Sequence, residues 1–227
     1  MKREDVRARI EQIGIIPAVR ATSSEGARYA GETVCESGIP IAEITMTCPD
    51  APEVIAHLAK KLPNAIIGAG TVMDRETAQR CLDSGARFLT SPTFEREVVE
   101  FANEKNVVVF PGALTPSEVY RSWKAGSDFV KIFPCAQVGG ENYIRALRGP
   151  FPQVKLIASG GVNQQTIINF FLSGATAVGI GGELIPKEAI QQHQTERINE
   201  LARRFLAYVH SARQRLASMK PVAAKKK

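Results

Sequence analysis

The sequence is poor in the side chains that build metal sites and disulfide scaffolds. Its 227 residues include three histidines and four cysteines, and no two cysteines stand close together. Because metal centres usually draw on clustered His and Cys ligands, we expect no metal site. We find neither a signal peptide nor a long apolar run, which predicts reduced thiols, a cytoplasmic location and no membrane span.

The composition also lacks the extremes typical of disordered chains, with 44% hydrophobic and 23% charged residues. The net charge of +6 lies in residues 191–227, which carry +7 and leave residues 1–190 at −1. Apolar residues recur there at helical spacing, so we interpret the segment as a solvated helix with a disordered basic tail over 220–227. We expect no nucleic-acid or membrane partner, although clustered basic residues leave that alternative open.

Short β-rich runs recur along the chain, and their starts lie about 20 to 27 residues apart. Each interval has room for one strand, one helix and two turns. The eight runs are residues 14–20, 41–46, 65–72, 88–92, 107–113, 129–134, 155–162 and 177–184.

The segments between these runs carry helix signals. Residues 23–38, 73–85 and 115–126 each begin at a Ser, Asp or Thr cap and end at a glycine. Eight strand–helix units predict a (β/α)8 TIM barrel, formed as a single domain over residues 1–219 with an extra N-terminal helix over residues 2–12. An open doubly wound sheet is the runner-up, but no GxGxxG motif follows the first strand.

The stretch "DFVKIFPC" places Lys131 inside an otherwise apolar strand. Alternation puts Lys131 on the face opposite Val130 and Ile132, and it puts Glu43 opposite Ala42 and Ile44 in the second strand. The apolar faces should meet the helices. Lys131 and Glu43 are therefore predicted to point into the barrel.

A lysine and a carboxylate in one water-poor pocket allow two interpretations. Burial disfavours the ammonium form, so Lys131 would supply the free amine that attacks a carbonyl to form a Schiff base, with Glu43 as acid and base. The alternative is a buried ion pair that only holds the barrel together.

Two glycine pairs favour an anionic ligand. Gly160 with Gly161 and Gly181 with Gly182 follow the seventh and eighth strands, where barrels commonly bind phosphate. Thr71 and Arg20 add a hydroxyl and a cation suited to a carboxylate, with a surface salt bridge as the alternative for Arg20.

The motifs "AEIT", "IGAGTV", "SPTF", "PGALTPSE", "KIFP" and "SGGV" occur in this order over nearly all of residues 13–185. In this the chain resembles the 2-keto-3-deoxy-6-phosphogluconate / 4-hydroxy-2-oxoglutarate aldolase family. The resemblance implies a cofactor-free class I aldolase, usually a homotrimer, that releases pyruvate and an aldehyde from a keto acid.

The resemblance also implies roles for individual residues. Lys131 forms the imine and Glu43 is the acid and base. The candidate substrate-binding residues are Arg20, Thr47, Thr71, Pro92, Phe133, Ser159, Gly160, Gly161, Gly181 and Gly182; among these, Thr71 binds the carboxylate, Phe133 and Pro92 line the pocket, and Ser159 with the glycine pairs bounds the phosphate end.

The sequence departs from the family pattern at two positions. Thr47 stands where many members have an arginine, and Arg20 is a candidate to replace it. Glu183 stands where many members have a phosphate-binding serine. A carboxylate repels phosphate, so Glu183 must turn away, be offset by Lys187, or indicate a different end group on the substrate.

Three alternatives to this function stay open. One is an aldolase for 2-keto-3-deoxy-6-phosphogalactonate, and another is a sugar-phosphate isomerase or epimerase on the same barrel. The third is a non-catalytic sugar-acid binder in which Lys131 and Glu43 are only paired.

Overall fold

The computed structural model describes residues 1–219, and the expected basic tail over 220–227 lies outside them. The strands are β1 Ile15–Val19, β2 Ile41–Thr45, β3 Ile66–Gly70, β4 Phe88–Thr90, β5 Val108–Phe110, β6 Gly112–Ala113, β7 Val130–Ile132, β8 Leu156–Ser159 and β9 Ala175–Ile180. The α-helices are α1 Arg3–Ile13, α2 Ser24–Glu36, α3 Ala51–Lys61, α4 Arg75–Asp83, α5 Arg96–Glu104, α6 Pro116–Lys124, α7 Glu141–Arg148, α8 Ile167–Leu172, α9 Lys187–Gln191 and α10 Thr195–Met219.

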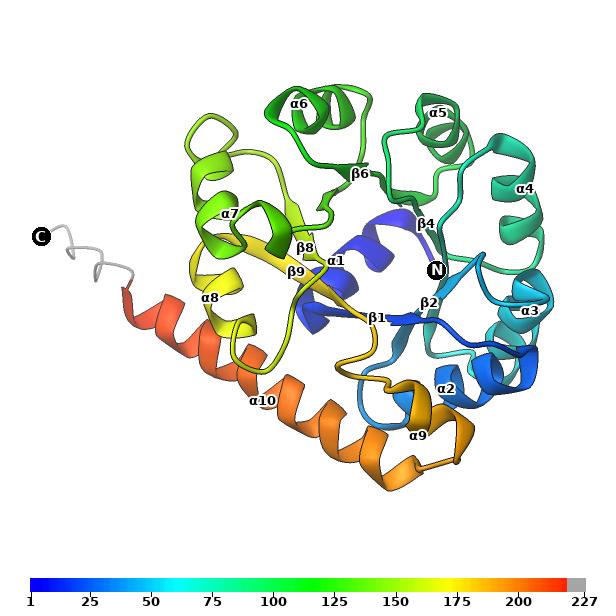
Figure 1. Cartoon of the computed structure of the whole chain (residues 1–227). Helices are drawn as coiled ribbons and strands as arrows, with labels where there is room; N and C mark the ends of the chain where they lie inside the picture. Colours follow the sequence, from blue (N-terminus) through cyan, green and yellow to red (C-terminus); the bar gives the residue numbers. More distant parts are fainter. Residues whose placement is uncertain (220–227) are drawn as a thin grey trace, which may run out of the picture.

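The strands form one parallel sheet that curves into a barrel with helices outside it (Figure 1). The sheet order β5-β4-β3-β2-β1-β9-β8-β7-β6 begins and ends at strands that only Pro111 separates in the chain. Because proline has no N–H to donate, the predicted strand over 107–113 divides there. Its first part pairs with β4 and its second with β7, which closes the ring and confirms the TIM-barrel prediction.

The predicted caps begin three of the helices. Ser23, Asp74 and Thr115 each accept a hydrogen bond from a backbone N–H in the first turn of α2, α4 and α6. Glu118 completes a capping box in α6, because its carboxylate accepts the N–H groups of Thr115 and Leu114 at 2.7 and 2.8 Å.

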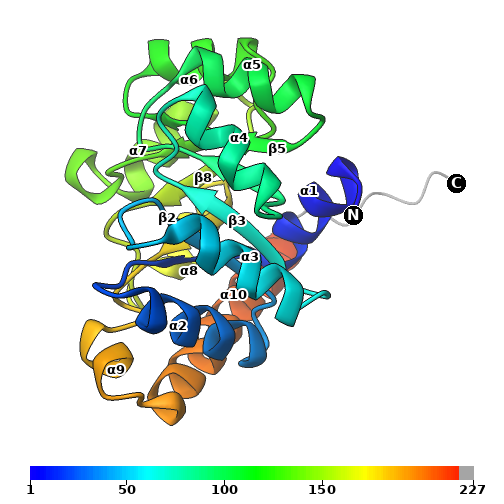
Figure 2. The same ribbon diagram turned by 90° about the vertical axis from the view of Figure 1, so that its right-hand side faces the viewer.

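Helix α1 closes the end of the barrel where the strands begin (Figure 2). Val6 and Ile10 of this helix are buried against the barrel. Arg3 forms an ion pair with Asp128 at 2.8 Å, and the same Asp128 oxygen accepts the N–H of Val109 in β5. The extra N-terminal helix therefore covers the end of the barrel opposite the carboxyl ends of the strands.

Helix α10 packs on the outside, against α8, α9 and α2 (Figure 1). Phe205 and Val209 on its inner face are buried, so the apolar residues at helical spacing pack against the barrel. Among residues 1–219, no helix has the length and apolar character needed to cross a bilayer.

The α6 capping box gives a pH-dependent stability prediction. The two backbone N–H donors hold the pKa of Glu118 below its ordinary value of 4.5. A lowered carboxyl pKa contributes stability that is fully present above 4.5 and is lost as pH falls through the folded pKa. We expect Glu118→Gln to lower the free energy of unfolding at pH 7 by about 1 kcal/mol, the usual scale for a cap.

Urea denaturation at several pH values measures this effect. The difference from the parent protein should shrink as pH falls below 4.5. Ser117→Ala, one residue away, should unfold like the parent. A Glu118→Gln deficit that is equally large at pH 3 would contradict the capping explanation.

Candidate active site

Two oppositely charged side chains meet inside the barrel. Lys131 Nζ lies 3.6 Å from Glu43 Oε1, with 7% and 3% of the two side-chain surfaces exposed. The apolar residues Val130, Ile132 and Ile44 on the opposite strand faces are fully buried. Strand alternation thus brings Lys131 and Glu43 together as predicted from the sequence.

Lys131 sits in the middle of β7, between β6 and β8. It is paired with Gly112 on one side and Ile157 on the other, and its N–H donates to the Pro111 carbonyl at 2.9 Å. A Cβ on Gly112 would lie 1.9 Å from the Pro92 carbonyl oxygen, so only glycine fits there. The segment that follows β4 therefore rests directly against the strand next to Lys131.

Glu43 comes from β2, whose neighbours are β1 and β3. Its side chain lies over Gly70 at the end of β3, where an added Cβ would approach Oε1 to 2.1 Å. Oε1 is buried and has no hydrogen-bond donor among the described residues. Since buried carboxylate oxygens are normally hydrogen-bonded, this oxygen is suited to a group supplied by a ligand.

A cavity of about 340 Å³ opens beside Lys131 at the carboxyl ends of the strands. Its size fits a small-molecule ligand. The Phe133 ring lies 5.5 Å from Lys131 Nζ. The predicted site residues on its wall are Arg20, Lys131, Phe133, Ser159, Gly160, Gly161, Gly181 and Gly182.

Four predicted residues lie away from this wall, and one of them is Glu43, which contacts Lys131 on the wall. Thr71 follows β3 in a left-handed conformation, with φ of 61°, and lines a separate recess that includes Met46 and Met73. The Thr47 hydroxyl bonds to Thr45 at 2.7 Å. The Pro92 carbonyl lies against Gly112 in β6.

Sequence reasoning missed several residues that shape the site. Gly70 makes room for Glu43, and Gly179 makes room for Ser159, whose Oγ would lie 2.8 Å from an added Cβ. Asn163 also lines the cavity, as does Glu183, which the sequence already marked as a departure from the family pattern. Gly70 and Gly179 could have been found from the sequence, because strand alternation predicts which glycines face the interior of the barrel, where a missing side chain leaves room for a neighbour.

A cysteine nucleophile and a metal ion have less support in this region than the lysine. Burial raises the pKa of the Cys135 thiol to about 12, so this neighbour of the lysine strand is no thiolate nucleophile at neutral pH. Within residues 1–219, no three His, Cys, Asp or Glu side chains are placed to hold a metal ion. Lys131 is the nucleophile that the geometry favours.

Comparison with known proteins identifies relatives of the chain. Residues 6–201 match the model of the KDPG and KHG aldolase family. The KHG/KDPG aldolase of Escherichia coli K12 is 30% identical over 83% of this chain and 89% of its own length.

Solved structures give the same result. A KDPG aldolase from Legionella pneumophila, crystallised with pyruvate captured as a covalent carbinolamine, superposes with a TM-score of 0.81 at 31% identity, covering 86% of this chain and 95% of that one. A structure described as native KDPGal has a TM-score of 0.81 at 26% identity, covering 88% and 96%. With its barrel, its buried lysine and its match over residues 6–201, the chain belongs to the KDPG and KHG aldolase family of carbon–carbon lyases.

Proposed function

We propose that this chain is a class I aldolase that cleaves a 2-keto-3-deoxy sugar acid to pyruvate and an aldehyde through a Schiff base on Lys131. The substrate would be 2-keto-3-deoxy-6-phosphogluconate, 4-hydroxy-2-oxoglutarate or both. The observation that carries the proposal is the buried 3.6 Å approach of Lys131 Nζ to Glu43 Oε1 beside a glycine-lined cavity. The covalent pyruvate adduct in the Legionella relative supports it.

The unpaired Glu43 oxygen favours this function over a purely structural ion pair. A buried ion pair contributes to stability only when hydrogen bonds satisfy its remaining polar atoms. Here Oε1 lacks a donor within residues 1–219, and its distance from Nζ is longer than a hydrogen bond. A substrate hydroxyl can donate to this oxygen while its carbonyl carbon reaches the amine.

Imine formation is the first step of the proposed reaction. The uncharged Lys131 amine attacks the C2 carbonyl of the substrate, giving a carbinolamine that takes up a proton from solvent and loses water to form an iminium ion. The iminium then serves as an electron sink for the bond between C3 and C4.

Glu43 carries out the proton transfers that follow. Its carboxylate removes the proton from the C4 hydroxyl, the C3–C4 bond breaks, and the aldehyde is released while the bonding electrons pass to the iminium nitrogen. The resulting enamine takes a proton at C3 from the Glu43 carboxylic acid. Water then hydrolyses the imine, which releases pyruvate and restores the amine.

The remaining roles come from the cavity wall. We assign Phe133 to the apolar side of the pocket, and Ser159 with the two glycine pairs to the far end of the substrate. Arg20, Thr47, Thr71 and Pro92 complete the proposed set, with Thr71 and Thr47 at the ends of the neighbouring strands β3 and β2. A 2-keto-3-deoxy-6-phosphogalactonate aldolase is the second candidate, since the KDPGal structure superposes equally well.

The proposal extends to assembly and location. We propose a homotrimer, on the basis of family membership, which sedimentation equilibrium would measure directly. We also propose a cytoplasmic enzyme. In residues 1–219 all four cysteines are free and buried, which suits a reducing compartment.

Trapping with borohydride tests the nucleophile. Incubating the protein with pyruvate and sodium borohydride should leave a stable adduct on Lys131, identified by peptide mass mapping, because reduction fixes the imine. Lys131→Ala should show neither adduct nor cleavage. As a control, Lys60→Ala, which removes an exposed lysine from α3, should be labelled like the parent. Full activity in Lys131→Arg would instead favour an isomerase.

Replacing the carboxylate tests the acid and base. Glu43→Gln keeps the shape of the side chain but cannot accept the C4 proton, so kcat for cleavage should fall by about 100-fold or more. Borohydride trapping of pyruvate should continue at a measurable rate. Glu36→Gln on the surface of α2 is the control, and a Glu43→Gln enzyme with unchanged kcat would rule out the assigned role.

The glycine beneath Glu43 gives an independent test of positioning. In Gly70→Ala the new methyl group must displace the Glu43 carboxylate, which lies 2.1 Å from the Cβ position. A shift of about 1 Å in a catalytic group can cost about 100-fold, so we expect kcat to fall between tenfold and 100-fold while Lys131 is still trapped by pyruvate.

The double variant Gly70→Ala with Glu43→Gln should be no slower than Glu43→Gln alone, because both changes affect the same carboxylate. Gly149→Ala is the control, since an added Cβ there has its nearest contact at 3.5 Å. Losses that multiply in the double variant would show that Gly70 acts in some other way.

A further inference from the structure

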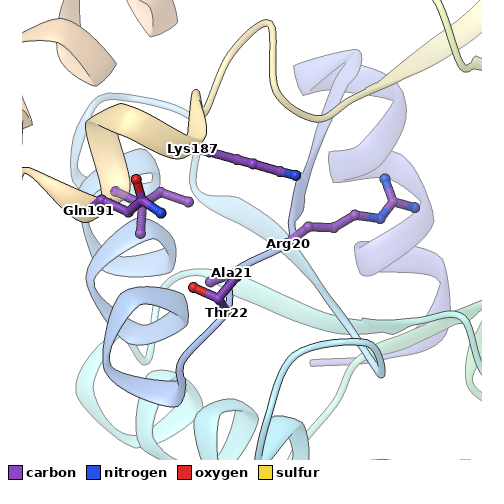
Figure 3. A pocket seen from close by; sticks show the side chains of 6 residues that line it. Arg20, Ala21, Thr22, Lys187 and Gln191 are labelled. Atoms are coloured by element: carbon purple, nitrogen blue, oxygen red, sulfur yellow. The ribbon is translucent and has the colours of Figure 1, made fainter.

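Two basic side chains lie side by side on the rim of the barrel. Arg20 follows β1 and Lys187 begins α9, and together with Thr22 and Gln191 they line a recess of about 30 Å³. In Figure 3 both long side chains point away from Gln191, and the Lys187 amine ends near the start of the Arg20 side chain, whose guanidinium reaches further. The rim therefore carries two neighbouring positive charges.

Neither charge is neutralised within the described part of the chain. In residues 1–219 no carboxylate lies within 4 Å of Arg20 or Lys187, and neither side chain donates a hydrogen bond. No acidic residue lines the recess. Because like charges held close together repel, this arrangement favours an anion that contacts both.

The recess adjoins the cavity that contains Lys131. Arg20 lines both spaces, and its Nη1 lies 3.8 Å from the position of a Cβ on Gly181. A ligand that reaches from Lys131 to the second glycine pair would therefore end beside Arg20, with Lys187 next to it.

Glu183 lies toward a different space. Besides the main cavity, it lines a groove shared with Gln164, Gln165 and Tyr208, and it does not line the Arg20–Lys187 recess. Gly181 and Gly182 thus have the basic Arg20–Lys187 recess on one side and the acidic Glu183 on the other. An anionic group bound there would be drawn to the basic side, away from the Glu183 carboxylate.

We propose that Lys187 acts with Arg20 to bind the negatively charged end group of the substrate, a phosphate or a carboxylate. This rests on the proposed aldolase function. The recess has room for about two water-sized atoms, so one or two oxygens of the anion would enter it while the rest lies over Gly181. Lys187 is a specificity-determining residue in this scheme and takes no part in proton transfer.

Steady-state kinetics of Lys187→Met on three substrates test the proposal. The substrates are 2-keto-3-deoxy-6-phosphogluconate, 4-hydroxy-2-oxoglutarate and unphosphorylated 2-keto-3-deoxygluconate. We expect kcat/KM to fall about tenfold for a substrate with a charged end group, mainly through KM, which corresponds to about 1.4 kcal/mol. The loss for 2-keto-3-deoxygluconate, whose end group is uncharged, should be less than twofold, and Lys187→Arg should retain most of the affinity.

Comparing the loss in kcat/KM on the first two substrates shows whether Lys187 acts on a phosphate or on a carboxylate end group. Lys60→Met, which removes an exposed lysine from α3, should match the parent on all three. Equal losses on all three substrates, or no loss with either charged one, would overturn the proposal.

A binding measurement keeps the proposal testable without turnover. Inorganic phosphate titrated against the full chain, followed by ³¹P NMR, should bind at least fivefold more weakly to Lys187→Met than to the parent and Lys60→Met. Equal phosphate affinities would contradict a role for Lys187. Failure of the proposed aldolase function gives a different result, namely the absence of a borohydride-trapped adduct on Lys131 in the parent protein.

Discussion

The contact between Lys131 and Glu43 is the constraint around which the interior of the barrel is built. Removing a charge from water costs several kcal/mol per ion, so each group is tolerated only because the other lies opposite it. The two come from β7 and β2, which are not neighbours in the sheet, and they meet across the interior. Closure of the ring at Pro111 is therefore what brings them within reach, because an open sheet would leave these strands far apart.

Small residues make this arrangement possible. Gly70, Gly112 and Gly179 each occupy a strand position where a side chain would collide with a neighbour that the site uses: the Glu43 carboxylate, the Pro92 carbonyl and the Ser159 hydroxyl, respectively. In a close-packed interior, even one methyl group must displace something. The strands thus give up apolar volume at these positions, and groups of the site fill the space.

The sequence was most informative where a strict period applies. Side chains alternate along a strand, so the apolar residues beside Lys131 and Glu43 were enough to predict that both point inward. Alternation ends with the strand, and it gave no guidance for Thr71, which turns into a left-handed conformation without a glycine to signal it. Likewise, no local pattern could show that Gly70 lies beneath Glu43 or that Lys187 adjoins Arg20, since these pairs are distant in sequence and meet only in the folded barrel.

The opening of the cavity and the covalent bond to Lys131 give the proposed reaction an order. Helix α1 lies across the end of the barrel where the strands begin, and the cavity beside Lys131 opens at the carboxyl ends of the strands. After C3–C4 cleavage the pyruvate half is still bonded to Lys131 in the interior, while the aldehyde half lies nearer the mouth. The aldehyde must then depart first and pyruvate second, and in the synthetic direction pyruvate must enter before its aldehyde partner, so the covalent bond to a buried lysine imposes a compulsory-order kinetic scheme.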